Sequence, residues 1–217
     1  TEQFFSDRRP QIDEIRRVAQ QRNMTLVSYS ILDAFDAGTS NPMLYIWVVQ
    51  PSGNIEFASV ELAPNLPRSE LIVSETGEIT SHRLPSEGIS LKELVTNTRQ
   101  SIGIWGDRAG APPTIAPADL AQLQAEAGEN LSQLHKLLIE PIAALLPTDP
   151  QQKVAFIPQG ELFLVPFPAL KDANGEYLIE NHTILTAPSI QVLQLPQELA
   201  GGDRANGHSP LQGEKTL

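Results

Sequence analysis

The side chains that could carry out catalysis are few, and the nearest pair is a histidine and a serine. His182 and Ser189 lie in one predicted strand-and-turn unit, and a histidine base beside a serine hydroxyl is the arrangement that activates serine as a nucleophile. The strand would hold the two side chains about 20 Å apart if fully extended. Ser189 follows Pro188 and fits the N-cap of a short helix. We therefore predict a structural role for Ser189 and no catalytic pair.

Thiol chemistry is excluded within these 217 residues, because none of them is a cysteine. The chain therefore holds no disulfide, thiolate metal site or cysteine nucleophile. The four histidines are scattered along the sequence at His82, His135, His182 and His208. On a helix, His135 would have Leu131 and Ile139 as its i−4 and i+4 neighbours, so it lacks a paired metal ligand. We expect no catalytic residue, metal site or cofactor site in this chain.

Other patterns that could suggest a site have simpler explanations. Residues 213–216 (GEKT) lack the earlier glycine of a phosphate-binding loop, and Glu214 would repel phosphate. Residues 166–168 (PFP) could line a peptide groove, but a packing role is favoured. Three carboxylates in the long helical region are predicted to be solvated: Glu126, Glu129 and Glu140. Three formal glycosylation acceptors are interpreted as chance matches: Asn23, Asn130 and Asn181.

Composition and charge narrow the class of protein. Hydrophobic residues make up 41% of the chain and the formal net charge is -11, which is typical of a globular protein and repels nucleic-acid phosphates. No apolar run reaches the roughly 18 residues that a membrane-spanning helix needs. The chain starts with Thr1 and has no signal-peptide layout, so we interpret it as part of a longer protein. A cytoplasmic protein that binds neither nucleic acid nor membrane is the expectation.

The first 62 residues predict a helix and an antiparallel meander. Residues 11–21 have apolar positions at helical spacing, and Asn23 suits the helix exit. Strands are expected at 25–32, 43–49 and 55–62. The middle one is apolar on both faces, so a central position is predicted. A tight turn at 51–54 (PSGN) joins the last two strands, and residues 36–42 form a looser connection.

Residues 63–150 are predicted to be irregular at first and then helical. No pattern stands out over 63–88. Ser90 and Glu93 form a capping box that opens a helix ending at Gly103. A longer helical region is expected over 117–146, with a kink or restart at Pro141, because proline cannot donate to the preceding turn.

The segment from 151 to 195 has a different character. Residues 153–158 are apolar on both faces, as in a parallel sheet, and further strands are expected at 162–165 and 182–187. A short helix should follow from 188 to 195, and residues 196–217 have the composition of a flexible linker. Strands 153–158 and 182–187 would leave sheet edges open, so the isolated chain should be marginally stable or oligomeric.

Four pieces of this last segment, in this order and spacing, resemble the opening of the CHAT domain, a caspase-like domain associated with tetratricopeptide repeats. They are 154–162 (VAFIPQGEL), 165–170 (VPFPAL), 177–180 (YLIE) and 187–189 (APS). Weaker similarity extends back through 137–142 (LLIEPI) to 26–30 (LVSYS). The resemblance implies an α/β fold: an N-terminal antiparallel β-meander with helices, leading into the first strands of a caspase-like, mainly parallel sheet.

The family's activity is cleavage of peptide bonds by a His–Cys dyad, carried in His-Gly and Ser-Ala-Cys motifs further along the chain. No histidine here precedes a glycine and no Ser-Ala-Cys occurs, so no catalytic role transfers to any residue. The resemblance implies the N-terminal scaffold of a cysteine peptidase, whose partners are a C-terminal catalytic segment, upstream helical repeats and a protein or peptide substrate. Residues 1–24 would join those repeats, 25–150 would form the meander and helical part, and 151–195 the first sheet strands. The alternative is a non-catalytic interaction or signalling module with the same fold.

Overall fold

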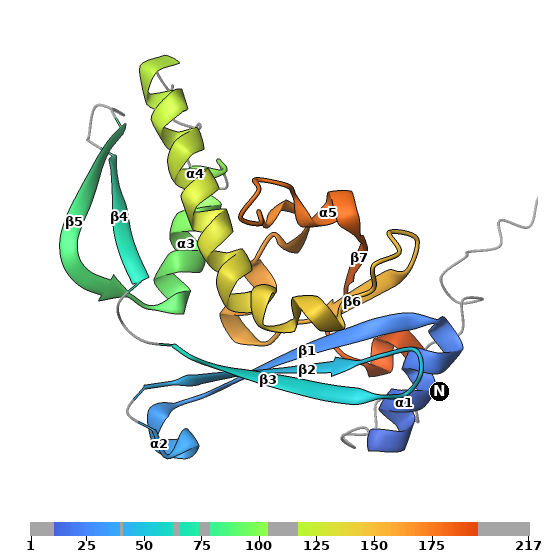
Figure 1. Ribbon diagram of the computed structural model, residues 1–217. Helices are drawn as coiled ribbons and strands as arrows, with labels where there is room; N and C mark the ends of the chain where they lie inside the picture. Colours follow the sequence, from blue (N-terminus) through green and yellow to red (C-terminus); the bar gives the residue numbers. More distant parts are fainter. Residues whose placement is uncertain (1–10, 40, 63–65, 74–78, 104–116, 195–217) are drawn as a thin grey trace, which may run out of the picture.

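The chain folds around a five-stranded sheet with the strand order β3-β2-β1-β6-β7 (Figure 1). The computed structural model describes residues 11–39, 41–62, 66–73, 79–103 and 117–194. The sheet strands are β1 (Met24–Leu32), β2 (Met43–Val49), β3 (Ile55–Glu61), β6 (Lys153–Ile157) and β7 (Thr183–Thr186). Strands β1, β2 and β3 form an antiparallel meander, whereas β1, β6 and β7 are parallel. The α/β class and the predicted meander are both confirmed.

The local signals of the first 62 residues are confirmed in detail. Helix α1 (Ile12–Arg22) ends at Asn23, whose φ of 47° is left-handed. The turn between β2 and β3 places Gly53 at φ 87°. This positive φ favours glycine. A Cβ there would lie 2.8 Å from Nε2 of Gln20, the end of a flexible side chain that can move aside. The looser connection after β1 contains a short helix, α2 (Ala34–Ala37).

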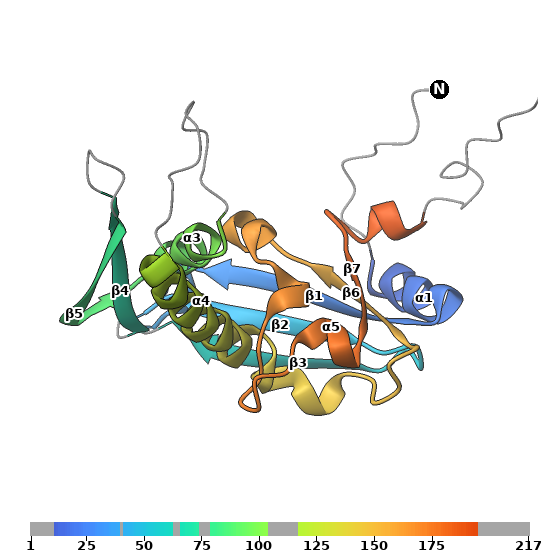
Figure 2. The same cartoon turned by 90° about the horizontal axis from the view of Figure 1, so that it is seen from above.

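One face of the sheet is covered by helices that follow the meander. Helix α3 (Leu91–Ser101) begins at the predicted capping box, in which the Ser90 backbone N–H donates to the Glu93 carboxylate at 2.8 Å. Helix α4 (Pro117–Leu138) is followed by a 3-10 helix, η1 (Glu140–Leu145), so the chain restarts around Pro141 as predicted. Seen from above, α3 and α4 lie over one end of the sheet (Figure 2). Their apolar faces and the inner face of the sheet share one core.

Two parts of the secondary structure differ from the prediction. Residues 63–88 are not irregular: β4 (Leu66–Val73) and β5 (Ile79–Ile89) form a separate antiparallel hairpin. Prolines at positions 67 and 85 argue against strands when only the sequence is considered. Each strand of a two-stranded hairpin has a free edge, however, and an edge strand tolerates proline. Residues 162–165 are not a strand but lie at the 3-10 helix η2 (Gly160–Leu164). Leu162 and Val165 are buried there, which is the spacing of a 3-10 turn.

The sheet has fewer open edges than the sequence predicts, and strand β2 is less buried than predicted. Strand β6 is paired on both sides, so among the described strands only β3 and β7 lie at an edge of this sheet. Strand β2 does lie inside the sheet, but its outer face is partly exposed, with 44% of Trp47 accessible. The expected linker at 196–217 lies outside the described residues.

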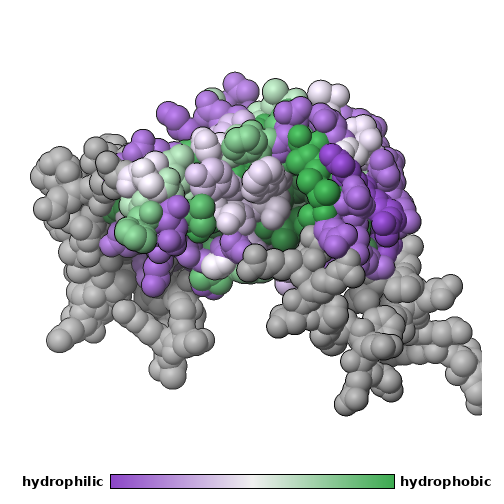
Figure 3. All heavy atoms as spheres, turned by 90° about the horizontal axis from the view of Figure 1, so that it is seen from below, coloured by the Kyte–Doolittle hydropathy of each residue, from purple (hydrophilic) through white to green (hydrophobic). Residues whose placement is uncertain are grey.

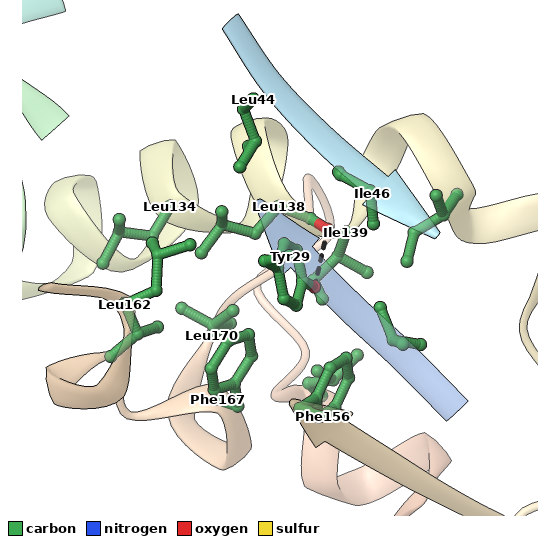
Figure 4. Packing of buried hydrophobic residues seen from close by; sticks show 14 of the residues in the cluster. Tyr29, Leu44, Ile46, Leu134, Leu138, Ile139, Phe156, Leu162, Phe167 and Leu170 are labelled. Carbon is green, nitrogen blue, oxygen red and sulfur yellow. Dashed lines mark hydrogen bonds between the residues drawn. The ribbon is translucent and has the colours of Figure 1, made fainter. Parts of the chain in front are cut away.

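The core is organised around Tyr29 of β1, which is buried with Phe156 and Phe167 (Figure 4). The ring centroids of the two phenylalanines are 4.5 Å apart, and Tyr29 lies 5.6 Å from Phe167. The Tyr29 hydroxyl donates to the Leu138 carbonyl at 3.0 Å. That carbonyl lies at the junction between α4 and η1. At this junction the Ile142 N–H donates to the Ile139 carbonyl. In a 3-10 helix the Leu138 carbonyl would accept from the N–H of residue 141, but residue 141 is a proline and has no N–H. The Tyr29 hydroxyl supplies the donor in its place.

Replacing Tyr29 by phenylalanine therefore leaves a buried carbonyl without a partner. We expect Tyr29→Phe to lower the free energy of unfolding by about 1–3 kcal/mol, measured by urea unfolding. Tyr45→Phe, at a partly exposed position of β2, is the matched control and should change stability little. Equal stability of Tyr29→Phe and the wild type would contradict this account of the α4–η1 junction.

The same hydroxyl should make stability depend on pH in alkali. Burial raises the pKa of Tyr29 well above its usual value, so the folded chain keeps a proton that the unfolded chain releases above about pH 10. Stability is therefore lost as pH rises beyond that value. Urea midpoints should fall more steeply above pH 10 in the wild type than in Tyr29→Phe.

Candidate functional site at the free edge of the parallel sheet

Strand β7 presents a sheet edge with no further strand among the described residues. The Ala187 N–H donates to the Phe156 carbonyl of β6 at 2.9 Å, and Thr186 is the register partner of Phe156. In a parallel pair, alternate residues point their backbone groups to opposite sides. The N–H and C=O groups of Ile184 and Thr186 therefore point away from β6. This arrangement can accept the backbone of another strand.

The segment before β7 fixes its position. The Leu178 N–H at the start of α5 (Leu178–Asn181) donates to the Leu170 carbonyl at 2.8 Å, and the Leu178 side chain is buried. At the first residue of β7, the Thr183 hydroxyl donates to the Pro150 carbonyl at 2.9 Å. These bonds tie both ends of the α5–β7 connection to the body of the fold.

The structure separates the two residues considered for nucleophilic catalysis. His182 precedes β7 and Ser189 follows it, so the four-residue strand holds them about 13 Å apart or more. The following 3-10 helix, η4, begins at Gln191. Ser189 therefore lies one residue before the N-cap position, and the predicted capping role is wrong.

The described histidines sit in different surroundings. Burial lowers the pKa of His182, and its Nδ1 atom is buried with no partner among the described residues. Burial also lowers the pKa of His135, against the opposing effect of the Asp172 and Glu140 carboxylates. Within the described part of the chain, no three His, Cys, Asp or Glu side chains gather as a metal site would require. The side chains of His82 and His208 lie outside the described residues.

The prediction for the helix carboxylates is partly wrong. Glu129 and Glu140 are exposed as expected, but Glu126 is buried, with 8% of its surface accessible. The Gln122 amide lies 3.5 Å from its carboxylate. Helix α4 contacts both α3 and β5. It therefore buries polar side chains at the border of its apolar face as well as the apolar side chains themselves. Asn130 is buried on the same side, which agrees with its interpretation as a chance glycosylation match.

Packing also accounts for the proline-flanked segment 166–168. Phe167 is buried in the aromatic core, with 1% of its surface accessible. It starts the 3-10 helix η3 (Phe167–Ala169). A groove built on this ring is therefore excluded, and the packing interpretation is confirmed.

Two hollows on the described surface lie along α4. One of about 540 Å³ lies between the end of α3, α4 and Lys171, whose Nζ is 4.8 Å from the centre of the Tyr177 ring. A second of about 570 Å³ lies on the other side of Lys171. Gly128 lines both. Separately, no described helix is both long and apolar enough to cross a membrane.

A comparison with known families matches the later part of the chain. Residues 128–207 match the model of the CHAT domain. The match begins within α4 and includes η1, β6, α5, β7 and η4. The resemblance drawn from the sequence is thus confirmed over these residues. No protein of curated function matches the chain.

The two described histidines predict how stability changes in mild acid. Their pKa values are lowered in the folded chain, so the unfolded chain binds more protons as pH falls through about 6.5. Stability should therefore be highest above that pH and decrease below it. We expect the urea midpoint to fall between pH 7.5 and 5.5, and His182→Gln to reduce this fall. A midpoint that rises on acidification would contradict the lowered pKa values of these two partly buried rings.

Proposed function

We propose, from the match of residues 128–207 to the model of the CHAT domain, that the chain is the N-terminal scaffold of a caspase-like cysteine peptidase. Its catalytic histidine and cysteine would come from a C-terminal segment that adds to the sheet. The observation that carries the proposal is the free edge of β7, at the end of a parallel three-strand unit. The compartment that we propose for this protein is the cytoplasm.

The chemistry of the proposed enzyme requires groups that this chain does not contain. A cysteine peptidase needs a thiolate, a base that takes its proton, and donors that stabilise the oxyanion. The 217 residues contain no cysteine. The described residues would act on the reaction only by fixing where the added strands lie, through the buried contacts among β1, β6 and the aromatic core. Protein or peptide is the proposed substrate class, and upstream helical repeats are a proposed partner.

A non-catalytic interaction module is the second candidate. Two observations favour it: the absence of the thiol, and the exposed aromatic pair Trp47 and Phe57 on the meander. Such a module would use the same fold for assembly or signalling, without cleaving a substrate.

The gene region beyond Leu217 separates the two candidates. The peptidase proposal expects His-Gly and then Ser-Ala-Cys in that region, and labelling of the longer product by a thiol-directed peptide probe. The 217-residue chain alone should show neither labelling nor hydrolysis. A stop codon directly after Leu217 would overturn the single-chain form of the proposal.

A substitution at the β7 edge tests the role of that edge. Thr186→Pro removes an outward N–H without touching the Ala187 bond to β6, so the longer protein should lose peptidase activity and resistance to limited proteolysis. Thr186→Val keeps the N–H and the β-branched shape, and it is the matched control.

In the 217-residue chain, Thr186→Pro should leave the urea midpoint near that of Thr186→Val. Full activity of the longer Thr186→Pro protein would show that no strand pairs at this position. A large loss of stability in the short chain would show that the proline disturbs β7 itself, and Thr186→Gly, which keeps the N–H, then provides the comparison for activity.

A further inference from the structure

Strand β3 forms the other edge of the sheet, and the direction of its backbone groups can be assigned. The Leu62 N–H donates to the Pro42 carbonyl at 2.8 Å, and the Gln50 N–H donates to the Asn54 carbonyl at 2.9 Å, at the two ends of the β2–β3 pair. Hydrogen-bonded and non-hydrogen-bonded pairs alternate in an antiparallel ladder. The even-numbered residues of β3 therefore bond to β2. The N–H and C=O groups of its odd-numbered residues point to the free edge: Ile55, Phe57, Ser59 and Glu61.

This edge has little of what usually prevents strand pairing. Proteins protect an edge with charged side chains, proline, a bulge or a very short strand. Strand β3 is seven residues long (IEFASVE), its pairing with β2 is unbroken, and it contains no proline. Its two charged residues lie toward its ends, so the centre, 57–60 (FASV), is uncharged. The β3 edge is therefore open to a further strand.

The outer face of the sheet, on the side of α1, exposes aromatic rings next to this edge. Phe57 stacks on Trp47, its register partner in β2, with ring centroids 5.2 Å apart, and 56% and 44% of these residues are exposed. Helix α1 packs on the adjacent row, which includes Ile55, through Val18. Figure 3, seen from the side that bears α1 and α2, shows apolar and intermediate residues at the surface between hydrophilic borders. Exposed rings beside unpaired backbone groups indicate a surface that pairs with another chain.

The residues of β3 complement a second copy of the same strand. When two such strands pair antiparallel with full overlap, Ala58 lies opposite Ala58 of the copy and Phe57 lies opposite Ser59. Each outward-pointing residue then faces an outward-pointing residue, as a hydrogen-bonded ladder requires. Both side chains of every pair lie on the same face of the joined sheet.

The charges of β3 do not oppose this register. Glu56 faces Val60 of the copy on one face of the sheet, and Glu61 faces Ile55 on the other. Like charges directly opposite each other would destabilise the pair, but no two carboxylates are opposite here. Slipping the strands until Glu56 opposes its own copy would also shorten the overlap. Full overlap is therefore the favoured register.

We infer that two copies of this chain pair through β3, antiparallel and about a twofold axis at Ala58, so that their two sheets become one. Phe57 of each copy is then diagonal to Phe57 of the other, about 7–8 Å away and within reach of an aromatic ring. The two Trp47–Phe57 stacks thus meet at the seam. Such a contact uses the same surface on both copies and closes at two. Strand β3 lies outside the residues that match the CHAT domain, so the inference does not depend on the proposed peptidase.

The position of η1 agrees with this symmetry. The Gln50 amide donates to the Leu145 carbonyl at the end of η1. At the start of η1, the Leu138 carbonyl accepts from Tyr29, whose row in the sheet includes Ala58. Helix η1 therefore lies over the half of β3 between Ala58 and the β2–β3 turn. The twofold axis places the second η1 over the other half, so the two helices are offset along the seam.

Cysteine trapping tests the register, because the chain has no cysteine of its own. Ala58 would face its copy in a non-hydrogen-bonded pair with Cα atoms about 4.5 Å apart, a separation that a disulfide can span. Ala58→Cys should therefore give a covalent dimer of the 217-residue chain under mild oxidation, detected by non-reducing electrophoresis. Glu56→Cys, on the same face of β3, is the matched control. Its two cysteines would lie about 13 Å apart along the seam and should give little dimer.

Association without a crosslink gives a second readout. One strand per copy is a small interface, so we expect a reversible dimer whose population rises with protein concentration. Ser59→Pro removes an outward N–H from each copy and leaves the β2–β3 bonds intact. It should raise the dissociation constant about tenfold or more in sedimentation equilibrium, since two hydrogen bonds are lost per dimer. Ser59→Thr keeps the N–H and should keep the dimer.

A third pair of variants tests the seam without proline. Phe57→Lys places like charges at diagonal positions and should weaken the dimer. Phe163→Lys makes the same change at a half-exposed ring of η2 and should leave the dimer unchanged.

Three outcomes would overturn the inference. They are a chain that stays monomeric at every concentration tested, equal disulfide yields from Ala58→Cys and Glu56→Cys, and a dimer that persists in both Ser59→Pro and Phe57→Lys. Loss of the dimer in Thr186→Pro but not in Ser59→Pro would assign the contact to the β7 edge, which also overturns it.

Discussion

A buried side-chain hydrogen bond links β1 of the meander to the junction between α4 and η1. The Tyr29 hydroxyl of β1 donates to the Leu138 carbonyl at the point where α4 gives way to a 3-10 helix. Pro141 creates the need for that donor, because it removes the N–H that would have served the carbonyl. The tyrosine also contacts Phe167, so one side chain links the meander, the long helix and the segment after β6. The packing of β6 and β7 therefore depends on β1, although β1 lies outside the residues that match the CHAT domain.

The two faces of the sheet differ in how they are covered, and its two edges are formed by different kinds of strand. The inner face is covered by α3, α4 and η1 around a continuous apolar core. The outer face is covered at the row nearest α1 and exposes aromatic rings beyond it. At one edge, β3 ends the antiparallel meander. At the other, β7 turns backbone groups of Ile184 and Thr186 outward. These outward groups leave β7 able to pair with a further strand.

Much of the fold could be predicted from local patterns, and the errors have identifiable causes. The capping box at Ser90 and Glu93, the left-handed exit at Asn23 and the restart at Pro141 depend on neighbouring residues alone, and all are present. The β4–β5 hairpin was missed because prolines obscure its alternation. Residues 162–165 have strand-forming side chains, yet Gly160 at φ 54° turns the chain into a 3-10 helix. Glu126 is buried because its helix is covered on two sides, a property that depends on partners distant in sequence.

The sequence by itself determined the chemistry that this chain lacks and the family to which its later segment is similar. Absence of cysteine is a property of composition, and the pieces from Val154 to Ser189 form a linear pattern that needs no fold to be read. The tertiary structure alone decided that β6 is enclosed, that β7 is the open edge, and that His182 and Ser189 lie at opposite ends of a strand. The physical reason is that strand pairing joins residues more than 100 positions apart, as between β1 and β6. Local propensity specifies which segments can be strands, but pairing and burial specify which of their edges remain free.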